Sequence, residues 1–115
     1  MSVVIYHNPK CSTSRKVLDA IRAKGIEPKI VLYLETPPSK AKLRAWLKTM
    51  DARPRDLLRK KGDLYRELGL DDPTLSDSAI LDALAEHPVL IERPVVETAR
   101  GAVLCRPPER LQDVL

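Results

Sequence analysis

The chain has 115 residues, of which 43% are hydrophobic and 31% charged, and its net charge at pH 7 is +4. This length suits one domain with one core, and no apolar run approaches the roughly 20 residues of a membrane-spanning helix. The N-terminus lacks a basic segment followed by a long apolar one, so we expect no secretory signal, no membrane contact and a cytoplasmic location. The basic residues are spread out and aromatic residues are few, which favours small anionic partners and argues against nucleic-acid binding.

The first third of the chain predicts a β-α-β unit. The apolar run at residues 3–6 is typical of a short buried strand, and the run at residues 30–33 is typical of a second strand. Residues 12–24 between them have the spacing of an amphipathic helix, and Gly25 is a suitable C-terminal stop. Because a connection that contains a helix joins parallel strands, we expect these two strands to pair in parallel.

The middle of the chain predicts a block of helices. Ser39 is a suitable N-cap for the first of them. Its apolar residues recur at i, i+3, i+4 and i+7, on one core-facing stripe: Leu43, Trp46, Leu47 and Met50. A second helix is expected from Pro54 to about Lys61, with Gly62 as its stop. Ser76 is expected to cap a third helix, which ends before Pro88.

The last part of the chain predicts a β-hairpin and a short terminal helix. Residues 95–98 and 102–105 are typical of strands, with Arg100-Gly101 as the turn between them. The order β-α-β, helices, β-β-α indicates an α/β protein with a thioredoxin-like fold: a four-stranded mixed sheet with flanking helices. We expect a single domain over residues 1–115, with a helical insertion at about 39–88.

The segment richest in chemistry is the polar loop between the first strand and the first helix, His7-Asn8-Pro9-Lys10-Cys11-Ser12-Thr13-Ser14-Arg15. A cysteine at a helix N-terminus meets free N–H groups and the positive end of the helix dipole, which stabilise the thiolate. The same N–H groups can bind an oxyanion, with Ser12, Thr13 and Ser14 as further donors and His7 or Arg15 as positive charges. We therefore interpret Cys11 as a nucleophile and not as a small core residue.

Spacing excludes two other kinds of cysteine site. A phosphatase-type oxyanion loop needs an arginine six residues after the cysteine, but Val17 stands there and Arg15 comes at the fourth position. A CxxC pair is absent, since Ser14 is the third residue after Cys11. With two histidines and two cysteines far apart in the sequence, no metal site is expected.

Three arginines stand out by their context, because arginine binds oxyanions through several hydrogen bonds at once. They are Arg59, Arg93 and Arg106. Each has an alternative interpretation. Arg59 could belong to a solvated basic helix face with Arg55, which the sequence alone favours. Arg93 could be a loop residue that merely precedes Pro94, and Arg106 could pair with a surface carboxylate.

At these residues the chain resembles the glutaredoxin-dependent arsenate reductase (ArsC) family. The resemblance covers nearly the whole length, in matching blocks: 6–11 with Ser14-Arg15, 32–38, 57–60, 87–94 and 104–107. It implies that Cys11 is the arsenate-binding nucleophile and that His7 and Ser14 tune its thiolate. It implies that Arg59, Arg93 and Arg106 hold arsenate and its arsenite-level intermediates. Pro94 falls where thioredoxin-like folds have a cis proline.

The implied reaction uses thiols from outside the chain and no bound cofactor. The Cys11 thiolate attacks arsenate, glutathione then reduces arsenic to the +3 state as co-substrate, and glutaredoxin removes the glutathione left on the enzyme. The missing CxxC agrees with this scheme, since no resolving cysteine stands next to Cys11. Cys105 ends an apolar strand and is expected to be buried and structural. No long exposed apolar stripe indicates an obligate oligomer, so we expect a monomer.

Two other functions are compatible with the same fold. Redox-sensing regulators similar to Spx bind RNA polymerase, and many of them use an N-terminal CxxC switch that Ser14 removes here. Such regulators also have no need of three arginines near the cysteine. A glutathione-dependent thiol transferase would use the same basic surroundings of Cys11. Only the arginine triad argues against this last function.

Overall fold

The computed structural model describes residues 2–115, and the contacts within the chain divide it into two units. The first unit joins the chain up to Thr36 with Arg93–Leu115, and the second is Pro37–Glu92. The second unit nearly coincides with the insertion expected at 39–88. That residues 1–115 form a single domain stays a prediction.

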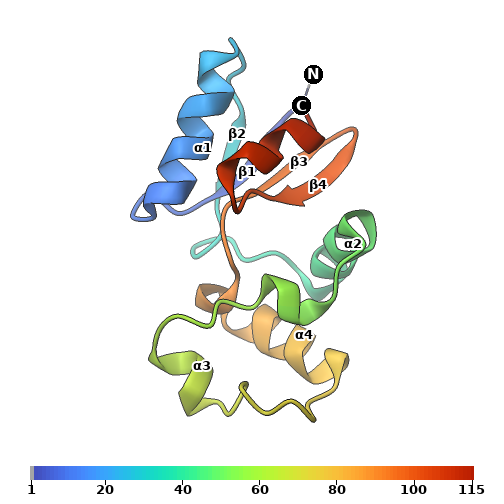
Figure 1. The fold of residues 1–115 in the computed structure, drawn as a ribbon. Helices are drawn as coiled ribbons and strands as arrows, with labels where there is room; N and C mark the ends of the chain where they lie inside the picture. Colours follow the sequence, from blue (N-terminus) through green and yellow to red (C-terminus); the bar gives the residue numbers. More distant parts are fainter. Residues whose placement is uncertain (1) are drawn as a thin grey trace. The chain divides into compact units, whose positions relative to one another are not determined.

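The first unit contains a four-stranded mixed sheet (Figure 1). Its strands are β1 (Val4–His7), β2 (Lys29–Leu32), β3 (Val95–Thr98) and β4 (Gly101–Leu104). They lie in the order β2-β1-β3-β4, with β1 parallel to β2 and antiparallel to β3. β3 and β4 form the expected antiparallel hairpin, in which Gly101 has a φ of 127° that favours glycine. The sequence-based prediction of a mixed sheet is confirmed.

The core of the first unit lies on one face of this sheet, between the strands and two helices. α1 (Ser12–Ala23) follows β1, and the 3-10 helix η3 (Pro108–Asp113) follows β4. α1 contributes three buried residues to this core, Val17, Leu18 and Ile21, as its spacing predicted. They pack in one cluster with Ile5 and Val96, which are cross-strand partners, and with Cys105 and Leu111.

The second unit is helical, and two of its helices begin at the caps that the sequence indicates. Its elements are α2 (Lys40–Met50), η1 (Pro54–Leu57), α3 (Asp63–Glu67), α4 (Asp77–Glu86) and η2 (Pro88–Leu90). The hydroxyl of Ser39 accepts from Lys42 N, and that of Ser76 accepts from Ala79 N, each at 3.1 Å. α4 packs against α2, η1 and η2, and Trp46 of α2 is fully buried.

The prediction of a helix over residues 54–61 is wrong. Only the 3-10 turn η1 forms, and Leu58 then makes an antiparallel bridge with Ile91. Arg59 N donates to Leu90 O and Glu92 N to Leu57 O, both at 2.7 Å, so backbone partners about 30 positions away replace the helix. Gly62, expected as a stop, instead precedes α3 as its N-cap with a φ of 109°, and α3 was not predicted.

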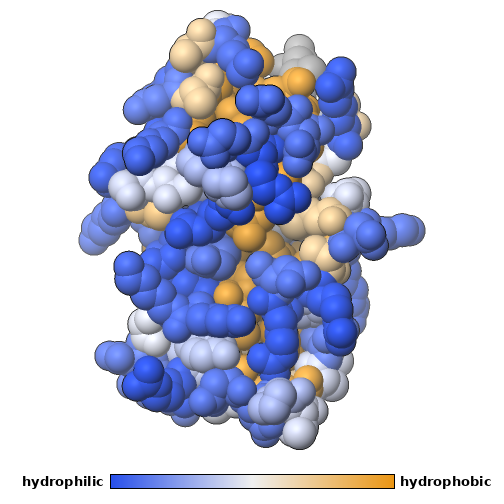
Figure 2. Space-filling model, viewed as in Figure 1, coloured by the Kyte–Doolittle hydropathy of each residue, from blue (hydrophilic) through white to orange (hydrophobic). Residues whose placement is uncertain are grey.

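Hydrophilic side chains cover most of the molecular face in Figure 2, and hydrophobic residues appear there as narrow strips between them. Within residues 2–115, no helix combines the length and the apolar character that crossing a bilayer requires.

Candidate active site

Cys11 lies where the loop after β1 turns into α1. It is the N-cap residue of α1, with extended backbone angles (φ −93°, ψ 123°), and its carbonyl accepts the first helical bond from Arg15 N at 3.0 Å. Its own N–H donates to Asn8 O at 3.0 Å. The side chain is partly exposed. The cysteine therefore has the position at a helix N-terminus that the sequence predicts, with access to solvent.

The surroundings of Cys11 stabilise its thiolate. Partial burial by itself would raise the pKa of the thiol, but the backbone N–H groups of Ser14 and Thr13 and the guanidinium of Arg93 outweigh it. The net pKa lies below the ordinary value of a cysteine. Because the thiolate is the nucleophilic form, this arrangement activates the sulfur.

His7 and Ser14 form a buried pair beneath the loop. The Ser14 Oγ lies 2.6 Å from His7 Nδ1 and accepts from Asn8 N at 3.1 Å. Ser14 thus acts on Cys11 through its backbone N–H, and not through the hydroxyl that the sequence suggested as an oxyanion donor. Burial, together with the charges of Arg22 and Arg15, lowers the pKa of His7 below 6.5. His7 is therefore neutral at pH 7 and does not supply the positive charge considered from the sequence.

Arg93 supplies that charge. It is 8% exposed, and its guanidinium donates a hydrogen bond to Cys11. The Arg93–Pro94 peptide bond is cis. Arg106 Nη1 donates to the Arg93 carbonyl at 3.0 Å, so Arg106 contacts the backbone at the Arg93–Pro94 bend. The interpretation of Arg93 as an incidental loop residue is wrong.

Arg59 belongs to the second unit, where its partner is a carboxylate. Its Nη1 lies 2.9 Å from Glu92 Oε1, and the two side chains are 19% and 21% exposed. The sequence favoured the interpretation that Arg59 lies on a solvated helix face. That interpretation is wrong, because the residue is neither helical nor freely solvated. Its binding of an oxyanion stays a prediction from the family resemblance.

The remaining loop residues differ in their positions. Ser12 and Arg15 are exposed, and Arg15 Nη1 donates back to the Pro9 carbonyl at 2.8 Å, which ties the two ends of the loop together. Thr13 is half-buried, and its backbone N–H is one of the groups that lower the pKa of Cys11. Val17 is buried in the core and offers no charge to the loop. Among residues 2–115, no group of histidine, cysteine and acidic side chains could hold a metal ion.

Cys105 has the opposite environment to Cys11. It is fully buried in the core of the first unit, as predicted, and burial raises the pKa of its thiol to about 12. At neutral pH it is a protonated, inaccessible thiol, which is poorly suited to act as a resolving cysteine.

Comparison with known proteins identifies the family. Residues 6–114 match the ArsC family. This chain belongs to the ArsC family. It is 50% identical over its whole length to an arsenate reductase of Rhizobium meliloti, of which it covers 82%. It is 46% identical to the uncharacterized protein YfgD of Escherichia coli K12, with 98% of this chain and 96% of that protein covered.

The solved structures agree with this assignment. An arsenate reductase from Vibrio cholerae superimposes with a TM-score of 0.94 at 47% identity, over 100% of this chain and 98% of that one. The thioredoxin-like ArsC fold predicted from the sequence is thereby confirmed.

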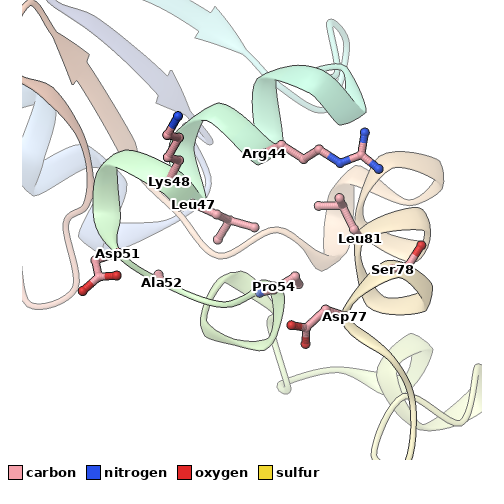
Figure 3. Close-up of a pocket in the computed structure, with 9 residues that line it drawn as sticks. All are labelled: Arg44, Leu47, Lys48, Asp51, Ala52, Pro54, Asp77, Ser78 and Leu81. Atoms are coloured by element: carbon pink, nitrogen blue, oxygen red, sulfur yellow. The ribbon is translucent and has the colours of Figure 1, made fainter.

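The second unit of this ArsC chain contains a cavity of about 460 Å³ (Figure 3). Nine residues of α2, the segment that follows it and α4 line the cavity: Arg44, Leu47, Lys48, Asp51, Ala52, Pro54, Asp77, Ser78 and Leu81. Arg53 Nη2 donates to both carboxylate oxygens of Asp77, at 3.0 and 3.2 Å. No cysteine or histidine is among the lining residues, so the cavity offers no nucleophile comparable with that of the Cys11 loop.

Sequence reasoning missed two polar residues of this ArsC chain that contact predicted site residues. Asn8 is buried and hydrogen-bonded within the Cys11 loop, although no role was predicted for it from the sequence. An Asn before Pro also favours a side-chain-stabilised turn, and that signal pointed to it. Glu92, the partner of Arg59, had no local signal, because the two lie 33 positions apart in the sequence.

Proposed function

We propose that this chain reduces arsenate to arsenite, with the Cys11 thiolate as nucleophile. The observation that carries the proposal is the place of a partly exposed Cys11 at the N-terminus of α1, where two backbone N–H groups and the Arg93 guanidinium lower its pKa. Such a set of donors stabilises both a thiolate and an attached tetrahedral oxyanion. Relatives named arsenate reductase, 45–50% identical over nearly the whole chain, support arsenate as that oxyanion.

The first proposed step is covalent. The Cys11 thiolate attacks arsenic, a sulfur–arsenic bond forms, and one arsenate oxygen takes up protons and leaves as water. Arg93 balances the negative charge at the sulfur, and Arg106, which holds the Arg93 carbonyl, keeps the bend before Pro94 in place. From the family resemblance we propose that Arg59, Arg106, Ser12 and Thr13 also bind the oxyanion.

The second and third proposed steps use outside thiols. A glutathione thiolate attacks the Cys11 sulfur, the sulfur–arsenic bond breaks with its electron pair on arsenic, and arsenite leaves. Two thiols are thereby oxidised to a mixed disulfide while arsenic gains two electrons. A glutaredoxin thiolate then takes the glutathione and frees Cys11. The burial of Cys105 and its pKa of about 12 support this need for external thiols. We place the reaction in the cytoplasm, where such thiols are kept reduced.

A coupled assay tests the proposal. NADPH oxidation is followed with arsenate, glutathione, glutathione reductase and glutaredoxin, for the wild type, Cys11→Ser and the matched cysteine variant Cys105→Ala. We expect arsenate-dependent turnover in the wild type, its fall to the enzyme-free background in Cys11→Ser, and its retention in folded Cys105→Ala. Failure of a folded wild type to turn over arsenate, while it reduces a glutathione mixed disulfide, would instead indicate a thiol transferase.

A further inference from the structure

Asn8 is a buried amide residue in the Cys11 loop, and three of its hydrogen-bonding groups bind other residues of that loop. Only 8% of the residue is exposed. Its side-chain Oδ1 accepts from Lys10 N at 3.0 Å, its carbonyl accepts from Cys11 N at 3.0 Å, and its N–H donates to Ser14 Oγ at 3.1 Å. Asn8 thus connects the end of β1, the turn over residues 8–11 and the first helical turn of α1.

The first two of these bonds define the turn that leads into α1. An Asn side chain that binds the N–H two residues later forms an Asx-turn, which fixes the backbone in the way a β-turn does. Here the turn also uses the N–H of Cys11 itself, because Asn8 O accepts it. The N–H groups left to stabilise the sulfur are therefore those of Thr13 and Ser14.

The third bond joins Asn8 to the buried pair beneath the loop. Ser14 Oγ receives the Asn8 N–H and also lies 2.6 Å from His7 Nδ1. These contacts fix the Ser14 side chain, and the side chain in turn fixes the first turn of α1, of which Cys11 is the N-cap residue. A displaced turn would therefore move the sulfur relative to both of its N–H donors.

We propose that Asn8 is a positioning residue, whose amide oxygen holds the turn over residues 8–11 so that the Cys11 sulfur meets the N–H groups of Thr13 and Ser14. The inference deepens the proposed function, because it takes Cys11 as the nucleophile. Asn8 acts through the backbone, and the charged groups around the loop, Arg93, Arg15 and Lys10, are left unchanged by its substitution.

The test is the pH profile of Cys11 alkylation by iodoacetamide, with the modified residue located by peptide mass spectrometry. In Asn8→Ala we expect the midpoint to rise by about one pH unit, with roughly tenfold slower alkylation at pH values below it, because the thiolate loses its aligned donors. Asn8→Asp keeps the acceptor but adds a negative charge. The rise of the alkylation midpoint in Asn8→Asp should therefore shrink in high salt, whereas the rise of the midpoint in Asn8→Ala should persist.

A matched control comes from the second unit. Asp72 Oδ1 accepts from Thr74 N at 2.8 Å, the same kind of turn across two residues. Asp72→Ala removes a comparable bond and should leave the alkylation profile of Cys11 unchanged. An unchanged midpoint in folded Asn8→Ala would overturn the proposal. Should Asn8→Ala fail to fold, Asn8→Ser tests the proposal in its place, because the serine hydroxyl forms a weaker turn of the same kind. In Asn8→Ser we expect a smaller, salt-independent rise of the alkylation midpoint, and an unchanged midpoint would contradict the proposal.

This readout separates the inference from the proposed function. Alkylation uses no arsenate, so a normal wild-type profile combined with an unshifted Asn8→Ala refutes only the role of Asn8. A wild-type Cys11 whose midpoint is not below that of an ordinary cysteine would refute the activated nucleophile on which both rest.

Discussion

At the scale of single residues, the same thiol group acquires opposite properties at two places in one unit. Cys11 stands at the start of a helix, where two N–H groups and Arg93 lower its pKa. Cys105 stands among apolar side chains, where desolvation of the charged form raises its pKa to about 12. The fold therefore assigns reactivity to one cysteine and inertness to the other through their surroundings alone.

The buried thiol predicts how stability depends on alkaline pH. Above about pH 9 the unfolded chain loses the Cys105 proton while the native chain keeps it, so the native state binds more protons and stability falls as pH rises toward 12. Each pKa unit of difference is worth about 1.4 kcal/mol. We expect urea unfolding between pH 8 and 10.5 to show a shallower pH slope for Cys105→Ala than for the wild type. Equal slopes would contradict the assigned environment, whatever the absolute stabilities.

The place of some residues of the site can be predicted from the local sequence, whereas the contacts of others cannot. The place of Cys11 at a helix N-terminus could be predicted from the strand and helix patterns on either side of it. The pairing of His7 with Ser14 spans seven positions and needs the α1 geometry, so its buried, neutral form was not visible in the sequence. The contact of Arg93 with Cys11 joins residues about 80 positions apart, which only the folded sheet brings together.

At the scale of elements, helices with a capping residue and an apolar stripe were predictable, and segments held by distant partners were not. α2 and α4 begin after Ser39 and Ser76 because those hydroxyls satisfy N–H groups of the first helical turn. The segment after η1 has a helix-compatible composition, but its backbone groups bind those of residues 90–92. Long-range pairing of this kind overrides local preference and leaves no local pattern.

The cap of α4 gives an element-scale prediction. Ser76→Ala removes the acceptor for Ala79 N and should lower the free energy of unfolding by about 1 kcal/mol. Ser78→Ala, an exposed position two residues further along the same helix, is the matched control and should not lower it. Chemical denaturation measures both changes. A loss in Ser78→Ala as large as that in Ser76→Ala would show that the cap contributes nothing specific.

At the scale of the whole molecule, the order of elements was enough to predict the sheet. A helical crossover requires β1 and β2 to be parallel, and a short turn requires β3 and β4 to be antiparallel. The apolar face of α1 and the inward residues of the strands then fix which side of the sheet holds the core. The sequence also predicted the inserted helical unit to within a few residues, and the contacts of the folded chain place its bounds at Pro37 and Glu92.

The most direct test of the central claim is to trap the chemistry on Cys11. Wild-type protein is mixed with arsenate and glutathione, without glutaredoxin, and quenched with acid before mass spectrometry. We predict a glutathione mixed disulfide on Cys11 that forms only with arsenate present, in equal amount to the arsenite released, while Cys105 stays unmodified. Arsenite release without modification of Cys11, or unchanged release by Cys11→Ser, would contradict the account.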